Sequence, residues 1–302
     1  MPIRKVSLFL FSLIVLCVLA AESVNAEVVR VFLLGGQSNM AGRARLAGLP
    51  TDPVNLQLPQ DDILFYYGRS LATLRPGSGR NFGPEVTFGR TVADAFPTEK
   101  FAIIKYARGG TSLSSDWEPV TGSTYSVFRK TVSKGLAELK QAGHTTKVAG
   151  MLWTQGERDA KAGRTTKQYE TDLKGFIADI RSHYGEELPF FISRLSRGQT
   201  DISESGLKNI RTAQENVAAS DSHVWLVDTD EMGLKRDHLH FDSNGQISLG
   251  RAFGKAFVDT FSIKPISESC CVNTAKAQKS KLWNPPLADS IFKTDLNVLQ
   301  PV

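Results

Sequence analysis

An α/β fold, with a parallel β-sheet covered by helices on both faces, is the fold class that this sequence predicts. Short apolar, β-branched runs typical of buried strands recur between residues 28 and 227. Amphipathic helical patterns lie between these runs, so that strand and helix alternate along the chain. Parallel neighbours need crossover connections over the faces of the sheet, and such crossovers are nearly always right-handed.

The strand predictions rest on apolar runs of strand length. Five runs are strong, and the one near residue 63 is weaker. The predicted strands are Val28–Leu34, Ile63–Tyr66, Phe101–Tyr106, Val148–Trp153, Phe190–Ser193 and Val224–Val227.

The helix predictions rest on apolar residues that share one face at a period near 3.6. The predicted segments run from Tyr125 to Leu139, from Tyr169 to Ile180 and from Leu207 to Val217. A closing helix is expected to begin near Asp242, where Ser243 and Gln246 have the spacing of a capping box, and to continue to Phe261.

The first 26 residues have the features of a secretion signal. Arg4 and Lys5 precede an apolar stretch from Val6 to Ala20, and small residues suited to signal-peptidase cleavage follow at 24–26. The alternative is a membrane anchor, but a stretch of about 15 apolar residues is shorter than the roughly 20 that a spanning helix needs. We therefore expect a secreted or periplasmic protein without stable membrane insertion once the signal is removed.

The rest of the chain is expected to hold one large domain at residues 27–262 and a tail or strap at 263–302, where helical periodicity fades. In the part after residue 26, cysteine occurs only as the neighbours Cys270 and Cys271. This excludes a disulfide framework and a zinc cluster, while the redox state of the pair stays open.

The charge of the chain is mild. It is +5 overall, and because the first 26 residues contribute Arg4, Lys5 and Glu22, the remainder carries +4 spread along the sequence. Nothing in this distribution indicates a nucleic-acid partner. The sequence leaves the oligomeric state open.

A serine follows the first predicted strand, in the motif GGQSN at residues 35–39. Ser38 is flanked by glycines, which permit a tight turn that lifts the side chain above the sheet edge and leaves backbone N–H groups free. A glycine-rich turn of this kind could instead hold a phosphate, but neither of the usual phosphate-loop patterns fits here. We therefore consider Ser38 a candidate nucleophile.

A serine nucleophile needs a base within hydrogen-bond reach and a third group that orients the base. Asp237 and His240 are the best candidates, since one short loop before the closing helix carries both. His238 is the rival base. His144, His183 and His223 lie at helix ends or before a strand, where surface roles are the usual explanation.

Two further loops follow predicted strands and could supply donors to an oxyanion. Gly109 and Gly110 follow the strand at 101–106 and could present a backbone N–H group, although an ordinary flexible loop is the alternative. Gln155 and Glu157 follow the strand at 148–153 and offer an amide donor and a carboxylate. The carboxyl ends of parallel strands meet at one edge, so these loops can form one site with Ser38.

Together these motifs resemble those of the sialate O-acetylesterases and of carbohydrate esterase family 6, which includes acetylxylan esterases, within the SGNH hydrolase superfamily. The matching blocks stand in the expected order over residues 28–261. They are GQSNMAG at 36–42, KYARGGTSL at 105–113, WTQGERD at 153–159 and DHLHFD at 237–242.

This resemblance implies a flavodoxin-like three-layer α/β/α sandwich and a site without metal or organic cofactor. Ser38 would be the nucleophile, His240 the general base and then acid, and Asp237 its orienting partner. The wider superfamily has an asparagine in the third block as an oxyanion donor; here Gln155 would take its place beside the N–H groups of Ser38 and Gly109 or Gly110. Glu157 would assist His240 instead of, or alongside, Asp237.

The expected activity is removal of O-acetyl groups from carbohydrates such as acetylated xylan or sialic acid, with Asn39, Asp116 and Trp117 as candidate substrate contacts. Core packing is the alternative for Trp117. A lipid or short-chain carboxylester hydrolase of the same superfamily is a second hypothesis. A catalytically silent glycan-binding protein is the third, although a binding protein has no physical need for an acid–base pair.

Overall fold

The computed structural model describes residues 28–76, 81–261 and 282–283 of this chain. The predicted signal sequence, Cys270 and Cys271, and nearly all of the predicted tail lie outside these residues. In chain order the elements are β1 (Val28–Gly36), α2 (Ser38–Ala41), β2 (Ala44–Arg45), the 3-10 helix η1 (Leu46–Gly48), β3 (Gln60–Tyr66), β4 (Leu71–Leu74), β5 (Asn81–Phe82), α3 (Glu85–Ala95), β6 (Lys100–Ala107), α4 (Ser123–Gln141), β7 (Thr145–Thr154), α5 (Glu157–Lys161), α6 (Thr166–Tyr184), β8 (Phe190–Ser193), α7 (Glu204–Ser220), β9 (Val224–Val227), α8 (Ser243–Phe261) and β10 (Leu282–Trp283).

The main sheet has the strand order β10-β9-β8-β7-β1-β6-β3-β4. Every pairing in it is parallel except that of β4 with β3, which is antiparallel. The predicted parallel sheet and α/β class are therefore confirmed, with one antiparallel edge strand. The pair Leu282–Trp283 adds a short parallel strand beside β9.

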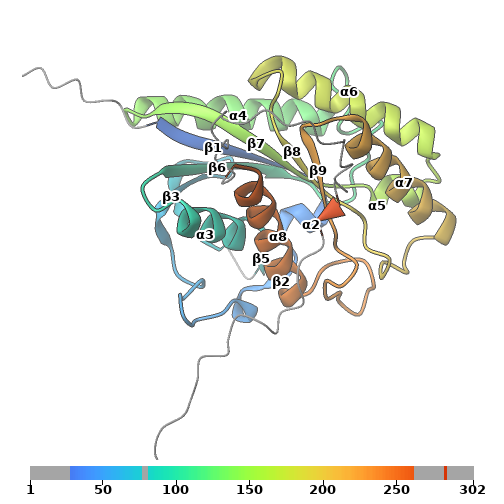
Figure 1. The fold of residues 1–302 in the computed structure, drawn as a ribbon, viewed down its shortest axis with the longest axis horizontal. Coiled ribbons are helices and arrows are strands. Elements are labelled where there is room, and N and C mark those ends of the chain that lie inside the picture. Colours follow the sequence, from blue (N-terminus) through green and yellow to red (C-terminus); the bar gives the residue numbers. More distant parts are fainter. Residues whose placement is uncertain (1–27, 77–80, 262–281, 284–302) are drawn as a thin grey trace, which may run out of the picture.

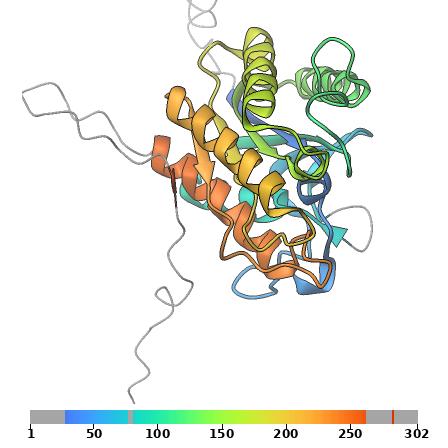
Figure 2. The ribbon, with the colours of Figure 1, turned by 90° about the vertical axis from the view of Figure 1, so that its right-hand side faces the viewer.

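Helices cover both faces of this sheet, as Figures 1 and 2 show. The helices α4, α6 and α7 pack on one face, and α3 and α8 pack together on the other. The central strand β1 serves both layers because its side chains alternate. Val31 and Leu33 enter the core beneath α4 and α6, whereas Phe32 and Leu34 enter the core beneath α3 and α8.

Aromatic rings fill both core layers. On the α4/α6 face, Trp117 packs edge-to-face on Trp153 with ring centroids 4.9 Å apart, and Trp153 lies 4.4 Å from Phe176. On the α3/α8 face, Phe32 contacts Phe88 and Phe257 edge-to-face at 4.9 and 4.7 Å. Aromatic contacts of this kind stabilise both layers beyond the effect of the apolar area that each ring buries.

The predicted strands and helices agree closely with the observed bounds. The cap at the start of α8 differs from the predicted capping box. Ser243 is the first helical residue, and the side chain of Asp242 caps the helix by accepting the Gly245 N–H at 2.8 Å. Gln246 does not complete a capping box. Its Nε2 donates instead to the backbone carbonyl of Asn39 at 2.8 Å, so the first turn of α8 is tied to α2.

Candidate active site

Ser38 is presented by a sharp turn at the carboxyl end of β1. Gly36 pairs with Ala107 of β6 on one side and Thr154 of β7 on the other, so all three strands end at the same level. Gly36 has φ = 143°, and a Cβ there would overlap the Thr154 carbonyl, which makes glycine necessary at this position. Ser38 then opens α2, between the loops that follow β6 and β7.

The structure brings Ser38, His240 and Asp237 into one hydrogen-bonded chain. Ser38 Oγ lies 3.0 Å from His240 Nε2, and His240 Nδ1 lies 2.8 Å from Asp237 Oδ2. A carboxylate can only accept, so Nδ1 carries the proton in this contact and Nε2 of the neutral ring is free to accept from the serine hydroxyl. This is the geometry that a serine nucleophile and its base require.

Asp237 also holds the loop that carries His240. Its Oδ1 accepts the backbone N–H groups of Leu239 and His240 at 3.0 and 2.9 Å. Partial burial works against ionisation of this carboxyl, but the hydrogen bonds from His240 and Leu239 and the nearby imidazole outweigh it and lower the pKa of Asp237 to about 2. Asp237 therefore stays ionised at any ordinary assay pH.

The other histidines do not share this position. His238 is exposed and has φ = 49°, and its backbone N–H donates to Lys235 in the turn before His240. His183 lies 3.6 Å from Asp179 on α6, and His223 contacts Ser222 beside β9. The loop therefore aims His240, and not its rival His238, at Ser38.

Asn39 is completely buried and ties α2 to the histidine loop. Its Nδ2 donates to Glu157 Oε1 at 2.6 Å and to the Leu239 carbonyl at 3.1 Å, while its Oδ1 accepts the Phe241 N–H at 3.0 Å. The residues on both sides of His240 are thus held by one side chain. The prediction that Asn39 contacts substrate is wrong, because every polar atom of its side chain is used internally.

Glu157 is buried next to Asn39 and does not hydrogen-bond to His240. Its Oε1 accepts from Asn39 and, at 3.3 Å, from Gln199 Nε2, and Gln199 also donates to the Leu239 carbonyl at 2.8 Å. Burial raises the pKa of Glu157, although the hydrogen bonds and the charge of His240 act in the opposite direction. The acid that contacts the imidazole is Asp237, while Glu157 supports the side chains that position the loop.

Gln155 is fully buried, and none of its side-chain hydrogen bonds is to Ser38. Its Nε2 donates to the Thr111 carbonyl at 2.9 Å and to Asp159 Oδ2 at 2.5 Å, and its Oε1 accepts from Tyr169 at 2.9 Å. With both N–H groups used, it cannot serve as the oxyanion donor that the resemblance implied. It fixes the glycine loop to the end of β7 instead.

The two glycines of the loop after β6 lie differently. A Cβ on Gly109 would come within 3.4 Å of Ser38 Cβ and 3.0 Å of Arg43 Nη2, so the backbone of Gly109 lies directly against the serine. Gly110 has φ = 71° and borders open space. Gly109 is thus the glycine whose backbone adjoins Ser38, and a role for Gly110 in the oxyanion hole stays a prediction.

Trp117 is fully buried in the core against Trp153, and its Nε1 donates to Thr111 at 2.9 Å. It has no face left for a sugar ring, so the prediction that it contacts substrate is wrong and the alternative of core packing holds. Asp116 is partly exposed and accepts the Ser112 N–H at 2.9 Å. A substrate contact by Asp116 stays a prediction.

The sequence reasoning missed Gln37 as well as Gln199. Gln37 Oε1 accepts the Arg158 N–H at 3.3 Å, which ties the residue before the serine to the start of α5. Both glutamines lie in loops, and neither belongs to a periodic apolar pattern or a charge pattern in the sequence. Only the structure therefore shows their partners.

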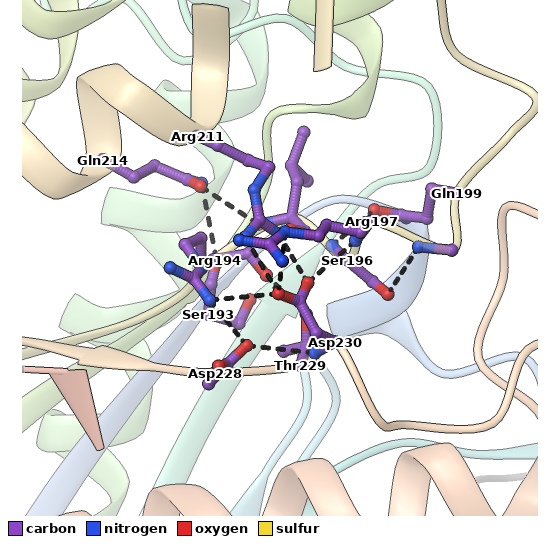
Figure 3. A network of polar contacts seen from close by, with 12 residues as sticks. Ser193, Arg194, Ser196, Arg197, Gln199, Arg211, Gln214, Asp228, Thr229 and Asp230 are labelled. Carbon is purple, nitrogen blue, oxygen red and sulfur yellow. Dashed lines mark hydrogen bonds and ion pairs between the residues drawn. The ribbon is translucent and has the colours of Figure 1, made fainter. Parts of the chain in front are cut away.

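A network of arginines and aspartates braces the loops that follow β8 and β9 (Figure 3). Arg194 contacts Asp228 and Asp230 at 2.8 and 3.2 Å, and Arg211 from α7 makes two hydrogen bonds to Asp230. These charges are mostly buried, and hydrogen bonds from Arg211 lower the pKa of Asp230 against the effect of its burial. The loop that carries Gln199 and the loop that carries His240 are therefore anchored to each other at their bases.

The comparison with protein families identifies the chain. The family described as carbohydrate esterase, sialic acid-specific acetylesterase matches residues 28–259. The chain belongs to this family. It is a carboxylic ester hydrolase, and the resemblance drawn from the four sequence blocks is confirmed.

Known relatives agree with this assignment. The probable carbohydrate esterase At4g34215 of Arabidopsis thaliana is 27% identical over an alignment of 255 residues, and the match covers 77% of this chain and 91% of the plant protein. The solved Arabidopsis At4g34215 structure has a TM-score of 0.63 at 23% identity, covering 77% of this chain and 98% of that one.

Two further structures share the fold. XAC1771, a carbohydrate acetylesterase from Xanthomonas citri, has a TM-score of 0.56 at 17% identity, covering 76% of this chain and 55% of that one. NanS has a TM-score of 0.54 at 15% identity, covering 80% of this chain and 100% of that one.

Among the described residues, no helix is long and apolar enough to span a membrane.

Proposed function

We propose that this carbohydrate esterase removes O-acetyl groups from carbohydrates outside the cytoplasm through a Ser-His-Asp acyl-enzyme mechanism. The observation that carries the proposal is the chain from Ser38 Oγ through His240 to Asp237, with contacts of 3.0 and 2.8 Å, beside the backbone of Gly109. The sequence features of a signal at residues 1–26 support a secreted or periplasmic location.

In the first half-reaction, Ser38 Oγ attacks the acetyl carbonyl carbon while His240 Nε2 takes the hydroxyl proton. Asp237, ionised because its pKa is about 2, stabilises the imidazolium that forms. The carbonyl oxygen becomes an oxyanion, and we assign the backbone N–H groups of Ser38 and Gly109 as its donors. Collapse of the tetrahedral intermediate breaks the ester bond, and His240 gives the proton to the departing sugar oxygen, which leaves as a hydroxyl.

In the second half-reaction, His240 takes a proton from water as the water oxygen attacks the acetyl-Ser38 carbonyl. The same donors receive the second oxyanion, and collapse releases acetate and restores the serine hydroxyl. Asn39 acts in neither step by contact. It keeps the histidine loop against α2 in both.

The test is acetate release from acetylated xylan, acetylated sialic acid and p-nitrophenyl acetate by wild type and by Ser38→Ala. We expect activity that falls at least a thousandfold in Ser38→Ala, while glycan binding is retained. Equal rates in the two proteins would contradict Ser38 as the nucleophile. Rates that rise from acetyl to octanoyl esters would favour a lipid esterase, and glycan binding without any hydrolysis would favour the binding-protein hypothesis.

A further inference from the structure

Lys105 and Glu85 form an ion pair inside the protein. Lys105 Nζ lies 2.5 Å from Glu85 Oε2, and the two side chains are only 1% and 3% exposed. Lys105 belongs to β6, and Glu85 is the first residue of α3. Charged side chains are almost never buried unless they are paired, and neither residue takes part in the acyl-transfer steps described above. The pair therefore needs an explanation of its own.

The pair lies against the end of α2, the short helix that presents Ser38. Lys105 Nζ donates to the carbonyl of Ala41, the last residue of α2, at 3.2 Å. The ring centroid of Tyr67 lies 5.4 Å from the same Nζ, within the range of a cation–π contact. Glu85 Oε1 accepts the backbone N–H of Gly83 at 3.2 Å. The contacts of the pair thus join the end of α2, the start of α3 and the strand β6.

Because α2 is a single turn, a contact at Ala41 also restrains Ser38. The Ala41 N–H donates to the Gln37 carbonyl at 2.8 Å, and the Gly42 N–H donates to the Ser38 carbonyl at 3.0 Å. A helix of four residues has no stability of its own, so contacts from other elements set its position. Lys105 supplies the side-chain contact at the end of this turn.

Lys105 also connects this turn to the loop that we assign to the oxyanion. Strand β6 ends at Ala107, and Gly109 follows two residues later with its backbone against Ser38. A single side chain on β6 therefore fixes the helix of the nucleophile to the strand that carries Gly109.

The cost of burying two charges argues that stability is not the main role of the pair. Desolvation offsets much of the attraction between buried charges, and apolar side chains of similar volume often replace such a pair without loss of stability. Apolar side chains would fill the same space, but they offer no donor to the Ala41 carbonyl and no acceptor to the Gly83 N–H. The charged pair differs from an apolar filling mainly in these directional contacts.

We propose that Lys105 and Glu85 are positioning residues, which hold Ser38 at the distance from Gly109 that the tetrahedral intermediate requires. The proposal rests on the esterase function above. It adds two buried residues that touch neither the substrate nor the reacting atoms and that act on catalysis through the position of α2.

The first experiment separates positioning from stability. Lys105→Met leaves the Glu85 carboxylate buried without its partner, and we expect Tm to fall by at least about 8 °C. Lys105→Met combined with Glu85→Gln removes both charges and keeps an amide oxygen for the Gly83 N–H. For this double variant we expect a Tm within about 4 °C of that of the wild type.

The activity of the double variant should not recover with its stability. We expect kcat for p-nitrophenyl acetate to fall by about ten- to a hundredfold with KM within about twofold of wild type, since a small displacement of a reacting group lowers the rate steeply. The rate at which a fluorophosphonate labels Ser38 should fall by at least about tenfold. That rate reports the reactivity of the serine and requires no acetylated substrate.

Arg181→Gln combined with Asp221→Asn is the matched control. This partly buried pair joins α6 to the residues before β9, at the opposite end of the sheet from Ser38. Removing its charges should leave kcat and the labelling rate within about twofold of wild type.

Gly83→Ala tests the position of the pair while both charges are kept. A Cβ on Gly83 would lie 2.6 Å from Glu85 Oε2 and 2.8 Å from Lys105 Nζ, so the pair has to move. We expect kcat to fall by at least about fivefold. Gly175→Ala on α6 is the control, because a Cβ there meets no atom of another described segment within 4 Å.

A double variant with the kcat and labelling rate of its control would overturn the proposal, and so would Gly83→Ala with the kcat of wild type. A double variant that does not fold, or that is as unstable as Lys105→Met, would also overturn it, because the pair would then serve stability. Wild-type protein that is labelled at Ser38 but hydrolyses none of the acetyl esters would refute the esterase function. In that case the labelling rates would still test the positioning role.

Discussion

Asn39→Ala is expected to weaken both the stability and the activity of this enzyme, because one buried side chain joins α2 to the histidine loop. The substitution removes hydrogen bonds of 2.6 Å to Glu157, 3.1 Å to the Leu239 carbonyl and 3.0 Å from the Phe241 N–H. Each buried group that loses its partner costs about 1 to 3 kcal/mol, and charged groups lie at the upper end. Gln199 still donates to Glu157 and Leu239, which reduces the penalty at those two atoms.

We therefore expect the free energy of unfolding to fall by about 2 to 4 kcal/mol, mainly from the Phe241 N–H and the Glu157 carboxylate. Activity should fall as well, since His240 lies between the two residues that are released. A displacement of about 1 Å at a catalytic group can cost about a hundredfold in rate. We expect kcat to fall by ten- to a hundredfold with a smaller change in KM.

The measurements are urea unfolding followed by fluorescence, and kcat determined at a temperature where the variant is fully folded. Asn216→Ala is the matched control, because Asn216 makes one exposed hydrogen bond to Glu170 on the surface. That control should change stability by less than about 0.5 kcal/mol and leave kcat unchanged. An Asn39→Ala protein as stable and as active as the control would refute the role given to Asn39.

Three further predictions concern the site and its support. Asp237→Asn should lower kcat by at least about a hundredfold through loss of the charge that stabilises the imidazolium. Since the pKa of Asp237 is about 2, the carboxylate should keep its charge down to about pH 4, so the gap in kcat between wild type and Asp237→Asn should persist over the whole assay range; equal kcat values in the two proteins would contradict this. Burial raises the pKa of Glu157, so above the ordinary carboxyl range the folded state still holds a proton that the unfolded state has lost. The free energy of unfolding of the wild type should therefore fall as the pH rises above that range. The urea midpoint of Glu157→Gln should not show this fall, and a pH dependence parallel to that of the wild type would contradict the prediction. Trp117→Ala should lower the free energy of unfolding by about 3 to 5 kcal/mol, seen as a lower Tm, whereas a small change would mean that the ring is not core.

The sequence is sufficient for the parts of this fold that depend on periodicity. Strands β8 and β9 have the predicted bounds, and α4, α6 and α7 each contain the predicted apolar face. The parallel order follows from the alternation of strand and helix. The antiparallel strand β4 and the helix α3 were not predicted, because β4 has only four residues and α3 contains Gly89 and two threonines, which have low helix propensity.

The proximity of Ser38, Asp237 and His240 could also be anticipated, since it requires only that two strand-end loops meet at one edge of a parallel sheet. The errors concern side chains whose direction the backbone position leaves open. Gln155 directly follows the last residue of β7, where its amide could turn toward the serine or toward the core, and its hydrogen bonds with the buried Asp159 and Tyr169 hold it in the core. Periodicity holds no information about such a choice.

Asn39 shows why residue type alone misassigns polar groups near a reactive serine. An amide next to the nucleophile suits substrate binding and loop support equally well in chemical terms. The role of the amide is decided by whether unpaired backbone groups of the histidine loop lie within hydrogen-bond distance of it. The two groups that do so, the Leu239 carbonyl and the Phe241 N–H, are 200 and 202 residues away along the chain, so the local sequence does not reveal them. Buried polar groups must be paired, so once the loop lies against α2 the amide is committed to it.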